Sequence, residues 1–93
     1  MPQITIEYVI ECRNGYFVFT RQAPELPSGV TWHVGTEFSD GWAEFPIVSL
    51  EIKKDGSVVV KAITDKSEKT AEDFPRSDME KLIEYGWELT EEG

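Results

Sequence analysis

The chain has 93 residues, of which 18 are acidic and 9 basic, so its formal net charge at pH 7 is −9. Hydrophobic residues make up 40% of it and aromatic residues 12%, a composition that excludes a disordered acidic tail and supplies one packed core. We expect a single small domain over residues 1–93, because so short a chain has no room for a second core. The negative charge and the lack of a basic patch disfavour direct binding to nucleic acid or to a membrane.

The first segment predicts a β-hairpin. Apolar and polar residues alternate from Ile4 to Cys12, as in a strand with one buried face. Asn14-Gly15 follows, and both residues tolerate the positive φ of a two-residue type I′ turn. That turn predicts a second strand over residues 16–21 and pairs Cys12 with Phe17 on the buried face.

The middle of the chain predicts a loop, a third strand and another hairpin. Pro24 and Pro27 indicate the loop, and residues 30–38 are expected to form the strand. Asp55-Gly56 predicts a second two-residue turn, which pairs Ile52 with Val59. In that register the residues on the core side are Val48, Leu50, Ile52, Val59 and Ile63.

The last third predicts the only helix. Residues 65–75 are polar and are expected to form a loop. Ser77 and Glu80 have the spacing of a capping box, so the helix is expected over residues 78–85. Gly86 is expected to end the helix, because glycine readily adopts the left-handed conformation that follows a helix. The apolar residues expected to face the sheet are Met79, Leu82 and Ile83.

The helix is expected to be followed by a short strand containing Trp87 and Leu89, with residues 91–93 fraying. The predicted fold is therefore α+β: an antiparallel sheet of about five strands, including two β-hairpins, with one C-terminal helix packed on it. The sequence does not indicate which face of the sheet the helix covers.

Catalytic and metal-binding patterns are scarce. Cys12 is the only cysteine and His33 the only histidine, so most nucleophilic and metal-binding schemes lack a second partner. Glu37, Asp40 and Glu44 surround a glycine turn that could hold a hard cation, but the EF-hand spacing is absent and a solvated acidic loop is the alternative. We expect no enzyme activity and no cofactor. A single cysteine, with no signal peptide or long apolar run, favours a cytoplasmic protein.

The acidic residues are unevenly distributed. Residues 67–93 contain nine acids and three bases, whereas residues 47–66 contain three acids and four lysines. The acidic last third predicts either a solvated helix face or a docking face for a basic partner, and the aromatic residues around Asp40-Gly41 are a second candidate. The residues expected to contact a partner are Glu72, Asp73, Glu80, Glu84, Glu88, Asp40 and Trp42.

Size, charge and the lack of catalytic motifs favour a non-enzymatic binding protein. It would dock on a basic surface of a partner protein that handles nucleic acid, as inhibitors of the anti-CRISPR, anti-restriction and nucleic-acid-mimic types do. Many such inhibitors are phage-encoded, and the likeness is one of size and charge alone. Two alternatives stay open: an accessory, regulatory or immunity-type subunit whose acidity serves only solubility, and a small metal-dependent enzyme using the acidic loop and His33. The partner and the oligomeric state do not follow from the sequence.

Overall fold

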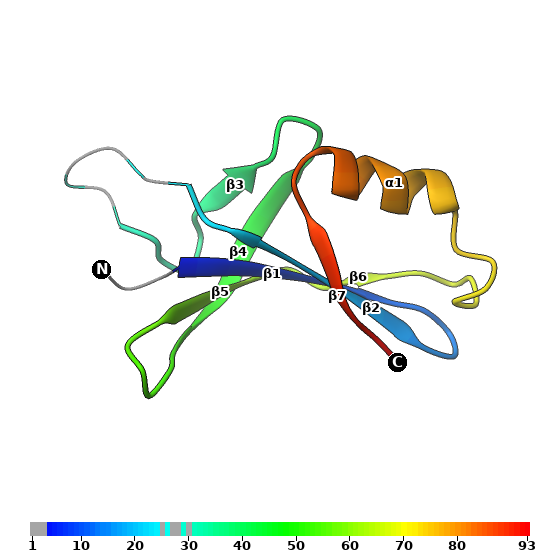
Figure 1. The fold of residues 1–93 in the computed structure, drawn as a ribbon, viewed down its shortest axis with the longest axis horizontal. Helices are drawn as coiled ribbons and strands as arrows, with labels where there is room; N and C mark the ends of the chain where they lie inside the picture. The colour runs from blue at the N-terminus through cyan, green and yellow to red at the C-terminus, as the bar shows by residue number, and fades with distance from the viewer. Residues whose placement is uncertain (1–3, 25, 27–28, 30) are drawn as a thin grey trace.

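The computed structural model describes residues 4–24, 26, 29 and 31–93, which form one small unit with a seven-stranded sheet and a single helix (Figure 1). The elements are β1 (Ile4–Glu11), β2 (Tyr16–Gln22), β3 (Glu37–Ser39), β4 (Glu44–Ile52), β5 (Val58–Ala62), β6 (Asp65–Lys66), α1 (Arg76–Glu84) and β7 (Glu88–Glu92). The strand order is β3-β4-β5-β1-β2-β7, and β6 also pairs with β1. The prediction of a small mixed α and β structure with one helix is confirmed.

The sheet is mixed and has seven strands, so the prediction of an antiparallel sheet of about five strands is wrong in both respects. The first half of β1 pairs in parallel with β5, and its second half pairs in parallel with β6, where Ile10 lies opposite Asp65. Directly after β5 the pairing with β4 continues, because the Ile63 N–H donates to the Pro46 carbonyl over 2.9 Å. The segment predicted as a loop from residue 65 therefore begins with a strand that places Asp65 beside β1.

The first hairpin forms with a longer loop than predicted. Glu11 pairs with Tyr16, and neither Asn14 nor Gly15 has a positive φ, so the type I′ turn is wrong. The loop instead folds against a later segment, because the Asn14 side-chain oxygen accepts a 2.8 Å hydrogen bond from the Ala71 N–H. The register differs from the prediction by two residues. An even shift leaves every side chain on its face, so the predicted burial of this hairpin is confirmed for Ile10, Phe17 and Phe19.

The predicted third strand is mostly irregular. Among the described residues of this segment, the strand begins only at Glu37, and it ends at Ser39. Val30 lies outside the described residues. A turn interrupts the extended chain, because Gly35 has a φ of 98° and the Thr36 N–H donates to the His33 carbonyl over 3.1 Å.

The second hairpin differs from the prediction by one residue. The Gly56 N–H donates to the Lys53 carbonyl over 3.0 Å and Gly56 has a φ of 89°, as in a three-residue loop that ends in a left-handed glycine. Ile52 consequently pairs with Val58 rather than with Val59. An odd shift reverses the faces of β5 relative to β4, so Val60 is buried although the predicted register places Val59, and not Val60, on the core side.

α1 starts earlier than predicted but ends as expected. Pro75 is the N-cap, Ser77 lies within the first turn and no side chain caps the helix, so the capping box is wrong. At the other end Gly86 has a φ of 99°, and the Trp87 N–H donates to the Leu82 carbonyl over 3.0 Å. This is the hydrogen-bond pattern of a Schellman motif, which explains why the helix stops there.

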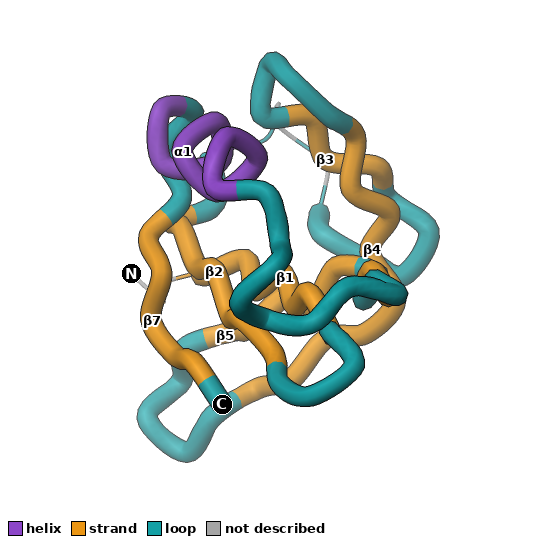
Figure 2. The backbone as a smooth tube through the Cα atoms, turned by 90° about the vertical axis from the view of Figure 1, so that its right-hand side faces the viewer, coloured by secondary structure: helices purple, strands orange, loops and turns teal. Residues whose placement is uncertain are grey.

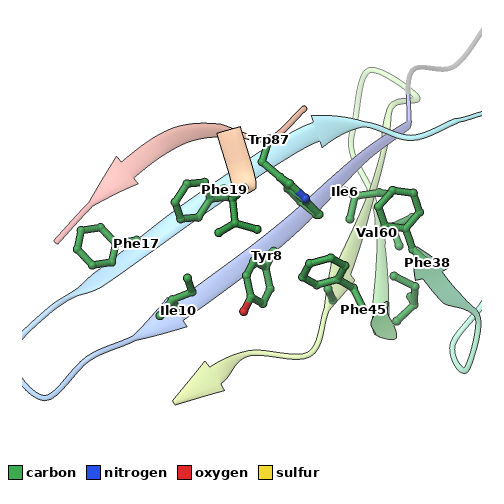
Figure 3. Packing of buried hydrophobic residues seen from close by; sticks show 12 residues of the cluster. Ile6, Tyr8, Ile10, Phe17, Phe19, Phe38, Phe45, Val60 and Trp87 are labelled. Atoms are coloured by element: carbon green, nitrogen blue, oxygen red, sulfur yellow. The ribbon is translucent and has the colours of Figure 1, made fainter. Parts of the chain in front are cut away.

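One row of side chains joins α1 to the sheet. The helix covers one end of the sheet (Figure 1), so Leu82 is buried and Met79 half-buried, while Ile83 is 54% exposed and its predicted burial is wrong. Trp87 is 2% exposed and lies against Tyr8 and Phe45 (Figure 3). The buried apolar residues are Ile6, Tyr8, Ile10, Phe17, Val18, Phe19, Phe38, Phe45, Ile47, Val60, Ala62, Leu82 and Trp87.

The C-terminal residues are paired, so the predicted fraying is wrong. Glu92 lies opposite Phe17 in β2, and Gly93 exchanges two hydrogen bonds of 2.9 and 3.0 Å with Tyr16. Arg21 of β2 connects the C-terminal end of α1 to the sheet: its Nη1 donates to the Tyr85 carbonyl over 2.7 Å, and its guanidinium lies 5.1 Å from the Phe38 ring centroid. A cation at this position complements the carbonyl end of α1.

Candidate functional site

A cleft of about 420 Å³ lies between α1 and the turn that joins β3 to β4. Figure 2 shows both elements rising from the same side of the sheet. We call it the α1–β4 cleft. Its aromatic lining residues are Tyr8, Trp42, Phe45 and Phe74, and its charged lining residues are Glu44, Asp65, Lys66 and Asp78.

Tyr8 and Asp65 meet at this cleft. Tyr8 is buried in β1, where its ring packs edge-on against Phe45 with the centroids 4.7 Å apart. The parallel pairing of β6 with β1 brings the Asp65 carboxylate within reach of the Tyr8 hydroxyl, which donates a hydrogen bond to it. Burial, then the hydrogen bond to Asp65 and its charge, raise the pKa of Tyr8 above its ordinary value, with a smaller contribution from Asp78. The hydroxyl therefore stays protonated at neutral pH, and the second Asp65 oxygen can accept a hydrogen bond from a ligand.

The cleft carries unneutralised negative charge. Glu44 comes from β4, Asp65 from β6 and Asp78 from the first turn of α1, and Lys66 is the single base among the lining residues. Throughout the described residues, the ion pairs use only the carboxylates of Glu51 and Glu84, so no basic side-chain nitrogen lies within 4 Å of a carboxylate oxygen of the three acids. A cationic group that entered would find carboxylates still available for pairing.

An aromatic pair stands beside the opening. The Trp42 ring stacks on the Tyr85 ring, with centroids 6.4 Å apart and an interplanar angle of 11°. Trp42 remains 43% exposed, so part of its side chain is available to a partner. The aromatic turn and the acidic helix, two separate candidates in the sequence, are thus brought together at the end of α1.

Asp40 has an internal role. Its Oδ1 accepts hydrogen bonds from the Trp42 and Ala43 N–H groups, both over 2.8 Å, and its Oδ2 accepts one from the Trp87 indole over 2.8 Å. These bonds hold the β3–β4 turn against the core and so position Trp42. The structure therefore gives Asp40 a positioning function that the turn signal did not indicate, while its contact with a partner stays a prediction.

The other predicted contact residues lie around α1 rather than in the cleft. Glu80 and Glu84, four residues apart on one exposed helix face, point away from the row that contains Asp78 and Leu82. Glu84 pairs with Lys81 over 3.3 Å. Glu72 accepts a 3.3 Å hydrogen bond from Asn14, and Asp73 and Glu88 are exposed on the preceding loop and on β7.

The residues considered for chemistry are dispersed. Cys12 is half-buried, and desolvation raises the pKa of its thiol. His33 is exposed, and its Nδ1 lies 2.9 Å from the carbonyl of its neighbour Val34. Of the acids suggested as cation ligands, Glu37 and Glu44 are exposed strand residues. Within the described residues, no group of three or more His, Cys, Asp or Glu side chains is arranged to hold a metal ion.

Sequence reasoning missed Tyr8, Asp65 and Asp78 as site residues. Tyr8 was visible as an inward-facing strand residue, and Asp78 as a helix residue, but nothing marked Asp65, which stands in a polar segment.

Comparisons with family models, curated proteins and solved structures find no match. None of the helical segments in the described part of the chain has the length and apolar character needed to cross a bilayer.

Proposed function

We propose that the protein is a non-enzymatic, cytoplasmic binding protein that docks on a basic surface of a partner protein. The α1–β4 cleft is the observation that supports this most, because it combines three unpaired carboxylates with aromatic walls. An arginine or lysine side chain of the partner suits it: the cationic head pairs with Asp65 or Asp78, and the stem or guanidinium plane packs on an aromatic ring such as Trp42.

The outer face of α1 supplies the longer-range part of the interaction. Glu80 and Glu84 are exposed there, and residues 67–93 carry six more negative than positive charges. Such a surface attracts a basic partner before contact and occupies lysines and arginines that would otherwise bind phosphates. The proposed consequence is inhibition of a nucleic-acid-handling partner, in the manner of anti-CRISPR, anti-restriction or nucleic-acid-mimic proteins.

Titration with N-acetyl-arginine amide, followed by NMR, tests the cleft without a partner. We expect chemical-shift changes at the Trp42 indole N–H and at the backbone amides of Asp65 and Asp78. Asp78→Asn or Trp42→Ala should lower the apparent affinity for the arginine derivative at least about fivefold. Asp55→Asn is the matched control, because it removes the same charge from the distant β4–β5 turn. Equal weakening by the control would show that only net charge is sensed and would contradict a site in the cleft.

Capture of partners from host lysate, followed by titration of each purified protein, tests the docking surface. We expect a basic partner whose affinity falls at least about tenfold between roughly 50 and 500 mM salt and falls again with Glu80→Lys combined with Glu84→Lys. An affinity that responds neither to salt nor to these changes would favour the accessory-subunit alternative, in which acidity serves solubility alone.

A further inference from the structure

The outer edge of β4 lacks a partner strand over its second half in the described part of the chain. β3 pairs with Glu44–Pro46, and hydrogen bonds from the β3 side reach only as far as Ile47. From residue 48 to residue 52, β5 is the single described strand that pairs with β4. Such an edge presents backbone N–H and C=O groups to any strand that can align with it.

Exposed apolar side chains follow this edge. Val48 is 48% exposed, Leu50 39% and Ile52 77%. Leu50 lies opposite Val60 and Ile52 opposite Val58, so both project from the core side of the sheet, whereas Val48 lies at a register shift between Ile47 and Ser49 that interrupts the alternation. The edge therefore carries a short apolar face, with no proline or charged residue on that face to keep another strand away.

We propose that the chain forms a two-fold symmetric dimer in which residues 48–52 of β4 pair antiparallel with the same residues of a second copy. This goes beyond the proposed function and does not depend on it. The dimer extends the sheet across the interface and covers the apolar face of each strand with that of the other.

The sequence of β4 is self-complementary in one register. With the two-fold axis at Leu50, this residue lies opposite its own copy, Ile52 lies opposite Val48, and Glu51 lies opposite Ser49. All facing apolar residues then meet apolar residues, and no like charges face each other. An axis at Glu51 would place two carboxylates opposite each other, so the first register is favoured.

The charge distribution also favours a second copy at this edge. Residues 47–66 contain four lysines and three acids, whereas the whole chain has a net charge of −9. Two copies repel each other least where their near-neutral segments meet. The β4–β5 hairpin points away from α1 (Figure 1), so the most acidic parts of the two copies stay apart in the dimer.

Sedimentation of the full chain over a concentration series tests the dimer. We expect a monomer–dimer equilibrium, with dimers prominent at about 100 µM to 1 mM, because the interface is small. Raising the salt concentration should strengthen association, since it screens repulsion between two acidic chains. Ile52→Lys should weaken association at least tenfold without unfolding the protein, because this side chain is 77% exposed.

Ile83→Lys is the matched control: it adds the same charge at another exposed isoleucine, on α1, and should leave dimerisation intact. In a Cys12→Ser background, Leu50→Cys should cross-link to its copy with a short thiol-reactive reagent, and Ile83→Cys should not. A chain that is monomeric at all concentrations overturns the proposal, even if β4 binds a foreign strand. Equal weakening by Ile52→Lys and Ile83→Lys, or no cross-link at Leu50→Cys, also overturns it.

Discussion

Asp40→Ala is expected to destabilise the protein strongly, although Asp40 lies in an exposed turn. The substitution removes three hydrogen bonds of 2.8 Å, two to turn amides and one to the Trp87 indole. The amides of Trp42 and Ala43 lie near the surface, so water replaces the carboxylate and each lost bond costs about 0.5–1 kcal/mol. Trp87 is 2% exposed, so its indole N–H would be buried without a hydrogen-bond acceptor, at a cost of about 1–3 kcal/mol.

The sum is about 2–5 kcal/mol, which corresponds to a fall in Tm of roughly 8–40 °C for a domain of this size. Urea denaturation followed by circular dichroism measures it. Asp40→Asn retains one oxygen and should give an intermediate loss. Combining Asp40→Ala with Trp87→Phe should be less damaging than the sum of the single changes, because both remove the same hydrogen bond.

Asp55→Ala is the control, since it also removes a carboxylate that accepts hydrogen bonds within a turn, those from the N–H and hydroxyl of Ser57. Both variants change the net charge equally, but Asp55 holds no buried donor. The urea midpoint should therefore fall much less for Asp55→Ala. If the two variants have the same midpoint, the argument that Asp40 anchors the turn through Trp87 is refuted.

Three further predictions concern the core and the helix end. Burial and the hydrogen bond to Asp65 raise the pKa of Tyr8, so the fold favours its protonated form; this stabilisation is complete below about pH 10 and is lost as the pH rises above it. The free energy of unfolding, measured in urea between about pH 9 and 11, should thus fall more steeply in the wild type than in Tyr8→Phe. Leu82→Ala should cost about 2–5 kcal/mol and Ile83→Ala less than about 1 kcal/mol, because Leu82 is 2% and Ile83 54% exposed; equal losses in chemical denaturation would contradict the packing of α1. Gly86→Ala should cost about 1–2 kcal/mol, since Gly86 has a φ of 99° and the new Cβ would lie 3.2 Å from Arg21 Nη1; an unchanged Tm would contradict this.

The two hairpins show how far local patterns determine a sheet. Alternation from Ile4 onward correctly identified the buried face of β1, and this result survived a wrong turn because the register moved by two. Asp55-Gly56 suits both a two-residue turn and a three-residue loop ending in a left-handed glycine. The choice between them moves the register by one, so the wrong turn placed Val59 instead of Val60 on the core side.

Features built by distant segments left no local signal. The parallel pairing of β1 with β5 and β6 joins residues about fifty positions apart, and the α1–β4 cleft depends on it for Asp65. Asp78 is one of nine acids in residues 67–93 and was not distinguished from the others, because helical spacing shows which residues share a face but not what the face meets. Trp42 was identified from composition, whereas its support by Asp40 and Tyr85 required the packed structure.

The proposed docking surface and the proposed dimer are expected to be coupled through charge. Each copy brings a net charge of −9 to the dimer, so repulsion opposes association even though the near-neutral hairpins make the contact. A cationic ligand bound in the α1–β4 cleft reduces this repulsion, and linkage requires that dimerisation then strengthen its binding by the same factor. An arginine-rich peptide should therefore increase the dimer fraction at low salt, and the effect should disappear at about 500 mM salt, where screening is short-ranged. Sedimentation with and without the peptide measures it, with Asp78→Asn expected to reduce the effect and Asp55→Asn to retain it. A peptide that dissociates the dimer would show that its binding site overlaps the β4 edge, contrary to the separation proposed for the two surfaces.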